Sequence, residues 1–392
     1  MVHPVSARPS AVDFDHHDQG IAKRIHEVYG ELRENNPVLW SENHGGFWVA
    51  TGYEAIQQIS QAPTDFTSDG ALIPDTTGGN ALVPQMLADP EHRVFRTLLR
   101  DWFTPRRIAG FEPDLRALTK RILDELDSPA DLASDFALKI PIEMILRVVG
   151  VADHNMDLIR DGVRYMVDQG GQDTSGAIDA WRAAMTFVSE VIVAPLRENP
   201  GDDILSYLLS RQHEEELLTD DAIAAIGFSM IGAGFDTTYK TLSSSLAYLA
   251  SDPDAQARAR QAPSAAVVEE MLRLCAPVAP GRTVRTESAV AGQDLHPGER
   301  VLLALPSANR DPAVFDDPDT ARFDRVNNRH LTFGTGIHRC LGMHLARLEL
   351  RVAFEEVFAA FESFSIADGE EATYAQSQVW GATRVPVQFR RR

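Results

Sequence analysis

The sequence predicts a mainly α-helical protein with a minor β-sheet region. Between residues 90 and 275, apolar residues recur at intervals close to the 3.6-residue period of an amphipathic helix. Strand-like pieces lie toward the two ends of the chain, at residues 45–52, 282–286, 300–305 and 384–389. They are far apart in the sequence, and nothing between them resembles a hinge. We therefore expect one domain over residues 1–392, with about residues 1–15 disordered.

The composition excludes several classes of protein. The 392 residues include 37 Lys plus Arg and 57 Asp plus Glu, which gives a net charge of −20. A general nucleic-acid binder needs a basic surface, so this acidic balance argues against one. No stretch approaches the ~18 apolar residues of a membrane span, and the N-terminus has no apolar leader. The two cysteines form no disulfide framework, so a cytoplasmic location is expected.

The longest predicted helix runs over residues 219–250. Thr219 is a good N-cap, and Asp220 and Asp221 follow in the first turn, where the helix dipole favours negative charge. The middle of this helix is apolar or small on all sides, which indicates a path through the core. It includes AGFDTT at 233–238, for which two interpretations are open. One is a kink with hydroxyls bonded to the preceding turn, and the other is a gap where a planar ligand or O2 approaches a polar relay.

Cys340 lies where a glycine-rich loop meets a helix. The segment FGTGIHRCLG at 333–342 is followed at once by a predicted helix. Backbone N–H groups at a helix start lower a thiol pKa and stabilise a thiolate. Three roles are open: an inert core thiol, a nucleophile assisted by His338, or a metal ligand. Zinc needs further Cys or His at metal-binding spacing, and none accompanies Cys340, whereas haem needs one axial thiolate.

The loop at 333–342 resembles the haem-binding signature Phe-Gly-x-Gly-x-His-x-Cys-x-Gly of cytochrome P-450 monooxygenases. Further segments follow the order of that family, namely DPEHRVFR at 89–96, AGFDTT at 233–238, EMLR at 270–273, ANRDP at 308–312 and FDR at 323–325. The resemblance covers roughly residues 20–390. It implies the family fold, in which haem lies between a long central helix and the cysteine loop.

The resemblance also implies roles for individual residues. Cys340 is the implied thiolate ligand of the iron of haem b, iron protoporphyrin IX, and Asp236 and Thr237 are the implied catalytic pair that delivers protons to bound dioxygen. Glu270 and Arg273 are the implied structural ion pair that holds the haem loop. The other implied cofactor-binding residues are His92, Arg96, Ala233, Gly234, Arg282, Phe333, Gly334, His338 and Gly342, and His92, Arg96, Arg282 and His338 among them are candidates for the haem propionates. Cys275, in an apolar run, is expected to be an inert core thiol.

The implied activity is that of a monooxygenase that hydroxylates, epoxidises or dealkylates a small hydrophobic substrate. Electrons would come from an acidic ferredoxin and its NAD(P)H-dependent reductase, because the sequence includes no flavin or iron–sulfur domain. Two alternatives are a peroxide-driven haem-thiolate enzyme and a non-catalytic haem-binding sensor. The Asp236–Thr237 pair counts against the first, and the long loop at 64–90, typical of substrate access, counts against the second.

Two surfaces follow from the same resemblance. The substrate pocket is expected to be apolar and to be lined by Leu72, Ile73, Leu82, Val83, Met86, Phe228, Ile231, Val278, Val379 and Trp380. The ferredoxin is expected to dock on a cationic patch made of Arg93, Arg100, Arg106, Arg107, Arg339, Arg347 and Arg351. The opposing interpretation of this patch is a set of solvated arginines paired with neighbours such as Glu349 and Glu355.

Overall fold

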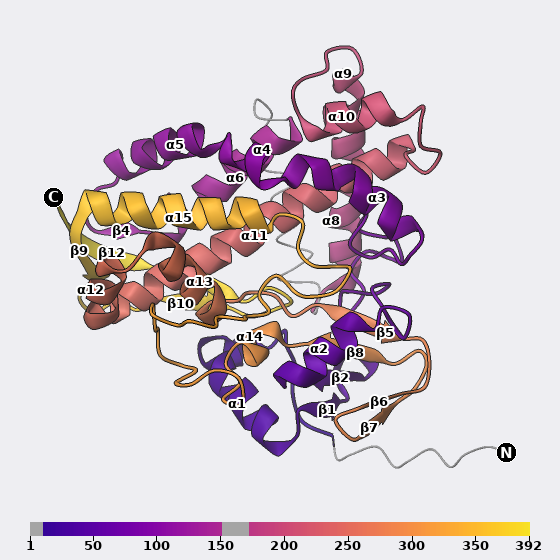
Figure 1. Cartoon of the computed structure of the whole chain (residues 1–392), viewed down its shortest axis with the longest axis horizontal. Coiled ribbons are helices and arrows are strands. Elements are labelled where there is room, and N and C mark those ends of the chain that lie inside the picture. Colours follow the sequence, from indigo (N-terminus) through magenta and orange to yellow (C-terminus); the bar gives the residue numbers. More distant parts are fainter. Residues whose placement is uncertain (1–10, 151–171) are drawn as a thin grey trace.

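Helices make up most of the protein, as the sequence predicts (Figure 1). The computed structural model describes residues 11–150 and 172–392, so the expectations for residues 1–10 and 151–171 lie outside the described residues. The α-helices of three or more residues are α1 Ile25–Asn35, α2 Tyr53–Gln61, α3 Glu91–Arg100, α4 Pro105–Ala109, α5 Glu112–Asp124, α6 Lys139–Val149, α8 Thr174–Phe187, α9 Ala194–Leu196, α10 Ile204–Arg211, α11 Asp220–Ser251, α12 Pro253–Gln261, α13 Ser264–Leu274, α14 Leu305–Ala308 and α15 Met343–Ala360.

The main sheet joins strands from both ends of the sequence. Its order is β1 (Val38–Ser41), β2 (Phe47–Ala50), β8 (Arg300–Leu303), β5 (Gly281–Val284) and β3 (Phe66–Thr67). Strands β2 and β8 are parallel, with Trp48 opposite Val301, and the other pairs are antiparallel. The predicted strand at 384–389 lies elsewhere: β12 (Pro386–Arg391) pairs with β4 (Ala130–Asp131) and β9 (Phe361–Ile366). Two hairpins, β6–β7 (Ser288–Val290, Gln293–Leu295) and β10–β11 (Thr373–Ala375, Gly381–Arg384), complete the strands.

The expectation of disorder through residue 15 is wrong for residues 11–15. The Val12 N–H donates to the Trp40 carbonyl at 2.8 Å, which adds this segment to the edge of β1. Phe14 is buried against Tyr29, with ring centroids 5.7 Å apart. Burial of one aromatic ring and one strand-like hydrogen bond therefore order a segment that has no periodicity in sequence.

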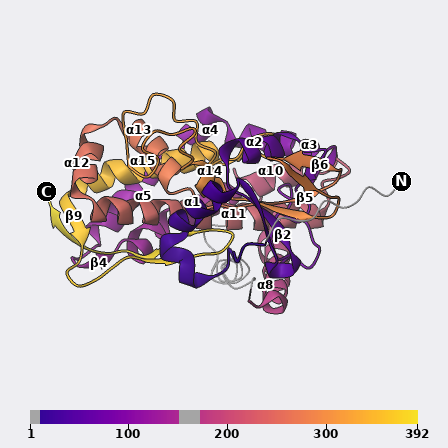
Figure 2. The same cartoon turned by 90° about the horizontal axis from the view of Figure 1, so that it is seen from below.

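The central helix α11 is 32 residues long and begins after Thr219, as predicted. The Thr219 side chain accepts a hydrogen bond from the Ala222 N–H at 3.2 Å, which satisfies one free donor of the first turn. In Figure 1, α11 crosses the middle of the molecule beside α15 and α13. Seen from below in Figure 2, α1, β2 and β5 lie in front of the helical part. Within residues 11–150 and 172–392, no helix combines the length and apolar character needed to cross a membrane.

Candidate active site

The cysteine loop turns sharply and delivers Cys340 to the start of α15. The Cys340 N–H donates to the Phe333 carbonyl at 2.8 Å, and the loop ends at Gly342, the residue before the helix. Gly336 has φ +74°, and a Cβ there would lie 2.3 Å from the Ser60 carbonyl oxygen. Glycine is therefore required at this position, both for the backbone conformation and for the close approach to α2.

The surroundings of the thiol differ from the simple helix-start prediction. Burial raises the pKa of Cys340, and this outweighs the lowering by the Gly342 N–H and by the positive charges of Arg96 and Arg347. The Gly342 N–H lowers the pKa of this thiol, as the helix start predicts, but burial has the larger and opposite effect. A coordinating metal ion deprotonates a thiol outright, so a half-buried cysteine with arginines nearby suits metal ligation.

Four nitrogen-bearing side chains gather beside this loop. His92 and Arg96 come from α3, and the His92 and His338 rings lie 4.3 Å apart, centroid to centroid. The Arg96 guanidinium donates to the Arg339 carbonyl at 2.5 Å. Burial, together with the positive charges of Arg282, His92 and Arg96, lowers the pKa of His338 to about 3. The structure thus brings together the four residues that the sequence suggests for the propionates.

This cluster fits a ligand with two carboxylates. Arg282 is buried, its guanidinium donates to the Gly281 carbonyl at 2.7 Å, and burial lowers its pKa to about 10. In the part of the chain that the structure describes, Arg282 forms no ion pair. A buried guanidinium is costly without an anion, so the donor set is incomplete until acidic groups bind. Haem, with its two propionates, meets this requirement.

The face of α11 around Ala233 is accessible in the middle of an otherwise buried helix. Ala233 is exposed and Thr237, one turn later, is half-exposed. Phe235, which lies between them in the sequence, and Thr238, which follows Thr237, are buried. The Thr237 hydroxyl donates to the Ala233 carbonyl at 2.8 Å, so the back-bonding interpretation describes this side chain. The helix is nevertheless continuous, without the break that a kink would need.

Gly234 has a packing role that the sequence does not predict. A Cβ at this position would lie 2.7 Å from the Ile145 side chain of α6, so the glycine lets α6 pack closely on α11. The sequence-based hypothesis assigned the small residue to the approach of a ligand. Local sequence patterns do not indicate the contact with α6, because Gly234 and Ile145 are far apart in the sequence.

Asp236 has a partner that the sequence analysis missed. Its carboxylate lies 3.6 Å from the Lys240 ammonium, one helical turn later, and both side chains are buried. Lys240 also donates to the Val379 carbonyl at 2.9 Å. The i, i+4 spacing of Asp236 and Lys240 is the signal that indicates this pair in the sequence. The lysine thus balances the Asp236 charge and ties α11 to the late turn before β11.

Glu270 and Arg273 of α13 form a buried ion pair, with two N–O contacts of 3.0 and 2.7 Å. Glu270 also accepts from the Arg325 side chain at 3.3 Å and from the Arg322 N–H at 2.8 Å. Arg273 donates to the carbonyls of Asn309, Pro318 and Thr320. The pair therefore organises the segment that leads into the cysteine loop.

The residues expected in the substrate pocket fall into three groups. Leu82, Val83, Met86, Phe228 and Ile231 belong to the large core cluster around α11, and Leu72 packs against it. Val278 and Val379 pair in a β-bridge. Ile73 and Trp380 belong instead to the N-terminal cluster, where the Trp380 ring stacks on Tyr374 and its N–H donates to the Ala22 carbonyl. The Trp380 ring thus packs on Tyr374, and its indole N–H has a buried partner.

Glu349 of α15 is a further buried acid that lies beside α11. Burial raises its pKa to about 8, although a hydrogen bond with the Thr238 side chain opposes this. The expected pairing of Glu349 with surface arginines is wrong, because the Glu349 side chain is buried at 1% exposure. Its position in an amphipathic helix is the signal: residues Leu345, Leu348 and Val352 on the same side are all buried.

Replacing this acid is expected to change how stability depends on pH. The folded protein binds the Glu349 proton more tightly than the unfolded chain, whose pKa is about 4.3. Protonated Glu349 therefore favours the folded state at low pH. The free energy of unfolding falls as the pH rises from about 4 through the folded pKa of about 8. Glu349→Gln should raise the free energy of unfolding at pH 8 by on the order of a few kcal/mol and have little effect near pH 4. Denaturant unfolding of both proteins at several pH values tests this, and equal pH slopes would contradict it.

Comparisons with known proteins identify the family. A family model described as Cytochrome P450 matches residues 126–263 and 264–388. The chain is 33% identical over 371 residues to Cytochrome P450 107B1 of Saccharopolyspora erythraea, covering 89% of this chain and 91% of that protein. It is 31% identical to the Steroid C26-monooxygenase of Mycolicibacterium smegmatis, covering 93% of this chain and 92% of that protein. A solved structure of CYP109E1 from Bacillus megaterium in complex with testosterone is similar, with a TM-score of 0.86 and 26% identity over 95% of this chain and 99% of that chain. The chain therefore belongs to the cytochrome P450 family.

Proposed function

We propose that this chain is a haem-thiolate monooxygenase in which Cys340 holds the haem iron. The observation that carries the proposal is the convergence of a half-buried cysteine with four nitrogen-bearing side chains, His92, Arg96, Arg282 and His338, around one loop. Haem, when bound, supplies dioxygen activation and electron transfer that no amino-acid side chain provides. Product formation with a ferredoxin and its NAD(P)H-dependent reductase, compared with peroxide alone, separates this function from a peroxide-driven enzyme.

Asp236 and Thr237 are proposed to move protons on the accessible face of α11. The Thr237 hydroxyl donates to the Ala233 carbonyl, and its oxygen can accept a proton while its own proton is passed on. Asp236, the residue before Thr237, is buried beside Lys240. Its carboxylate can exchange a proton from the buried side of the helix. This arrangement supports general acid catalysis at the face where Ala233 is exposed.

Thr237→Ala is expected to leave substrate binding nearly intact and to lower the product formed per NAD(P)H consumed severalfold. The hydroxyl contributes little apolar contact, and its proposed role is proton delivery. Thr241→Ala is the matched control, because Thr241 makes the same hydrogen bond to the carbonyl four residues earlier but is buried. Coupling and substrate-induced Soret shifts are measured for both variants. An unchanged coupling ratio in Thr237→Ala would show that this hydroxyl only bonds within the helix.

The substrate is proposed to be a hydrophobic molecule of steroid-like size. Five apolar residues of the expected pocket, Leu82, Val83, Met86, Phe228 and Ile231, belong to the large hydrophobic core that includes α11. A relative is named as a steroid monooxygenase, and a similar structure was solved with testosterone. Titration of the haem-loaded enzyme with a panel of steroids, fatty acids and small terpenoids tests this by the shift of the Soret band. A response confined to the smaller molecules would contradict the proposed size.

The proposed ferredoxin surface is narrower than the expected patch of seven arginines. Arg347 forms two hydrogen bonds with Glu269, and Arg351 contacts Glu112 at 2.6 Å. Arg107 pairs with Asp202 at 2.7 Å and covers the Trp102 ring. These three arginines therefore fit the paired interpretation. Arg106 and Arg339 are exposed and form no ion pair within the described ranges, and Arg100 contacts Asp101 only at 3.9 Å.

Arg93 is a poor residue for testing the docking surface. Its guanidinium bonds Asp89 at 2.8 Å, and Asp89 also lies 3.5 Å from the His92 ring, so a change at Arg93 reaches the haem side. Arg106→Glu is the cleaner variant. It is expected to slow electron transfer from an acidic ferredoxin severalfold at low salt, with the difference shrinking as salt screens exposed charges beyond ~8 Å.

The control for this experiment is Arg258→Glu on α12, an exposed arginine outside the patch. Stopped-flow reduction of the haem-loaded enzyme gives the transfer rate, and the substrate-induced Soret shift checks the site. If Arg106→Glu and Arg258→Glu are reduced at the same rate at low salt, this surface is not where the ferredoxin docks.

A further inference from the structure

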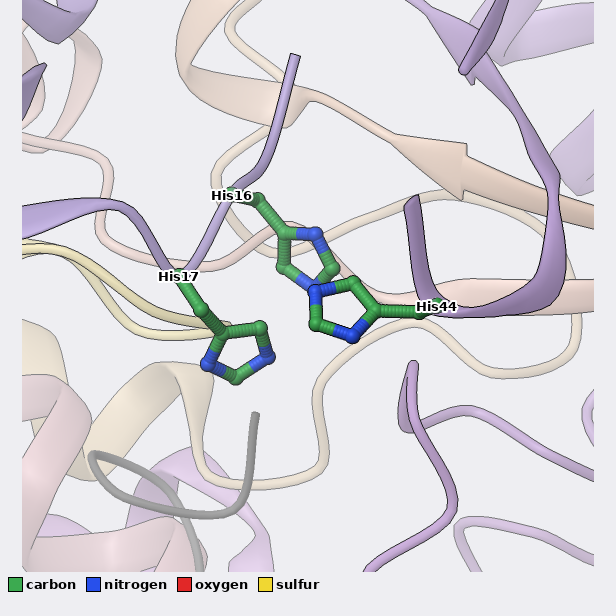
Figure 3. A group of neighbouring side chains, drawn as sticks. All are labelled: His16, His17 and His44. Atoms are coloured by element: carbon green, nitrogen blue, oxygen red, sulfur yellow. The ribbon is translucent and has the colours of Figure 1, made fainter. Parts of the chain in front are cut away.

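Three histidines meet at a place remote in sequence from the cysteine loop. His16 and His17 follow the segment that pairs with β1, and His44 lies in the turn Asn43–Gly45 between β1 and β2. One ring nitrogen from each histidine lies within 4.8 Å of the other two. Figure 3 shows the three rings turned toward one shared space, His16 and His17 from one segment and His44 from the opposite side.

Oxygen atoms complete the surroundings of the three rings. The Nε2 atoms of His16 and His17 converge on one oxygen, the Ile73 carbonyl, at 2.7 and 2.9 Å. The Nε2 atom of His44 lies 2.8 Å from a carboxylate oxygen of Asp15. In the tautomers that carry the proton on the other ring nitrogen, a metal ion among these rings would find three imidazole nitrogens together with a carbonyl and a carboxylate oxygen. Late divalent transition metals such as zinc prefer this mixture of donors.

Two features set this group apart from ordinary buried histidines. His16 is fully buried, and its Nδ1 atom has no hydrogen-bond partner, which leaves one buried polar atom unsatisfied. His44 adopts φ +52°, a left-handed conformation that non-glycine residues rarely have. The turn thus holds His44 in an unfavourable backbone conformation that directs its imidazole to the other two rings. Such strain is retained where a side chain must be held in one place.

The histidine group can close around a metal ion with small movements. Zinc binds imidazole nitrogens at ~2.0–2.1 Å, so two ligands of a tetrahedral site lie roughly 3.3 Å apart. The ring nitrogens are now at most 4.8 Å apart, so each pair would have to approach by at most about 1.5 Å to reach this distance. His16 and His17 are also buried and shielded from water. Attraction between a ligand and a metal ion is stronger in such surroundings, because the dielectric constant is lower.

We propose that His16, His17 and His44 bind one divalent zinc-class ion, with Asp15 or the Ile73 carbonyl as the oxygen donor. The ion joins three segments of the chain: the N-terminal segment, the β1–β2 turn and the loop that contains Ile73. Because that loop continues to Leu82, Val83 and Met86, the ion stabilises one end of the segment proposed to border the substrate. This site is separate from the haem site and does not depend on the proposed monooxygenase activity.

The test measures zinc binding to the haem-loaded full chain without an added histidine tag. The main variant is His44→Asn, because asparagine tolerates the left-handed conformation and removes the imidazole. The control is His213→Asn, at a histidine whose side chain is 74% exposed. Equilibrium dialysis against zinc chloride, with metal analysis, is expected to show one tightly bound zinc per wild-type chain. His44→Asn should bind it at least ~tenfold more weakly, while His213→Asn should match the wild type.

A second measurement keeps the proposal falsifiable if the variant is unstable. X-ray absorption at the zinc edge of the wild-type protein is distinct from the iron signal of haem. It should show imidazole ligands at ~2.0–2.1 Å with at least one oxygen. The proposal is overturned if wild type and His44→Asn bind zinc equally, if the wild type binds no zinc at micromolar concentration, or if the bound zinc has no imidazole ligands.

Discussion

Replacement of Cys340 by serine is expected to abolish thiolate ligation and monooxygenase turnover. A serine hydroxyl stays protonated at neutral pH and is a far weaker ligand for iron than a thiolate. Phe333 and Gly342 contact this position through the backbone, so the loop itself should persist in the variant. The expected result is a folded protein that holds haem weakly, lacks the thiolate spectrum and loses activity by several orders of magnitude.

Cys275→Ser is the matched control, because Cys275 is the other cysteine of the chain. Burial raises the pKa of its thiol to about 11, so it stays neutral and inert, as the sequence predicts. This variant should keep the thiolate spectrum and the activity, with at most a modest loss of stability. Activity in Cys340→Ser equal to that in Cys275→Ser would remove Cys340 from the mechanism.

Loss of Glu270 is expected to have the largest effect on stability. Arg273 is fully buried, and without Glu270 its charge has only carbonyl oxygens as partners. Breaking a buried pair by removing one partner costs about 3–5 kcal/mol. Glu270→Ala should therefore lower the free energy of unfolding by about this amount and reduce haem retention, since Arg322 and Arg325 before the cysteine loop also lose their acceptor.

The control is Asp179→Ala, which removes the partner of the exposed Arg182, because surface pairs contribute little. Denaturant unfolding and haem content after gel filtration are measured for both variants. A double variant, Glu270→Gln with Arg273→Met, should recover part of the loss because no charge is left buried. If Glu270→Ala is as stable as Asp179→Ala, the buried pair does not organise this segment.

Local signals account for the parts of the fold that the sequence predicts well. The Thr219 cap and the apolar middle of 219–250 lie within one helix, so α11 is found almost to the residue. The glycine loop that holds Cys340 and the start of α15 at Met343 are likewise contiguous. The mainly helical fold with a minor sheet is confirmed by the structure and by its similarity to solved cytochrome P450 structures.

Features set by distant partners are the ones that sequence analysis misses. Gly234 is small because of Ile145, and β12 pairs with β4 and β9 rather than with the main sheet. Trp380 packs on Tyr374, which no periodicity indicates. The pKa of Cys340 depends on desolvation by its surroundings, which opposes the local effect of the helix start. Long-range packing decides each of these cases, and it is absent from local patterns.

The most direct test of haem-thiolate ligation by Cys340 is the carbon monoxide difference spectrum of the reduced wild-type protein. A strongly red-shifted Soret band is expected, because a Cys340 thiolate would donate electron density to the iron of the bound haem. Cys275→Ser should give the same band, and Cys340→Ser should not. A folded, haem-loaded wild-type protein whose band is not red-shifted would contradict the account.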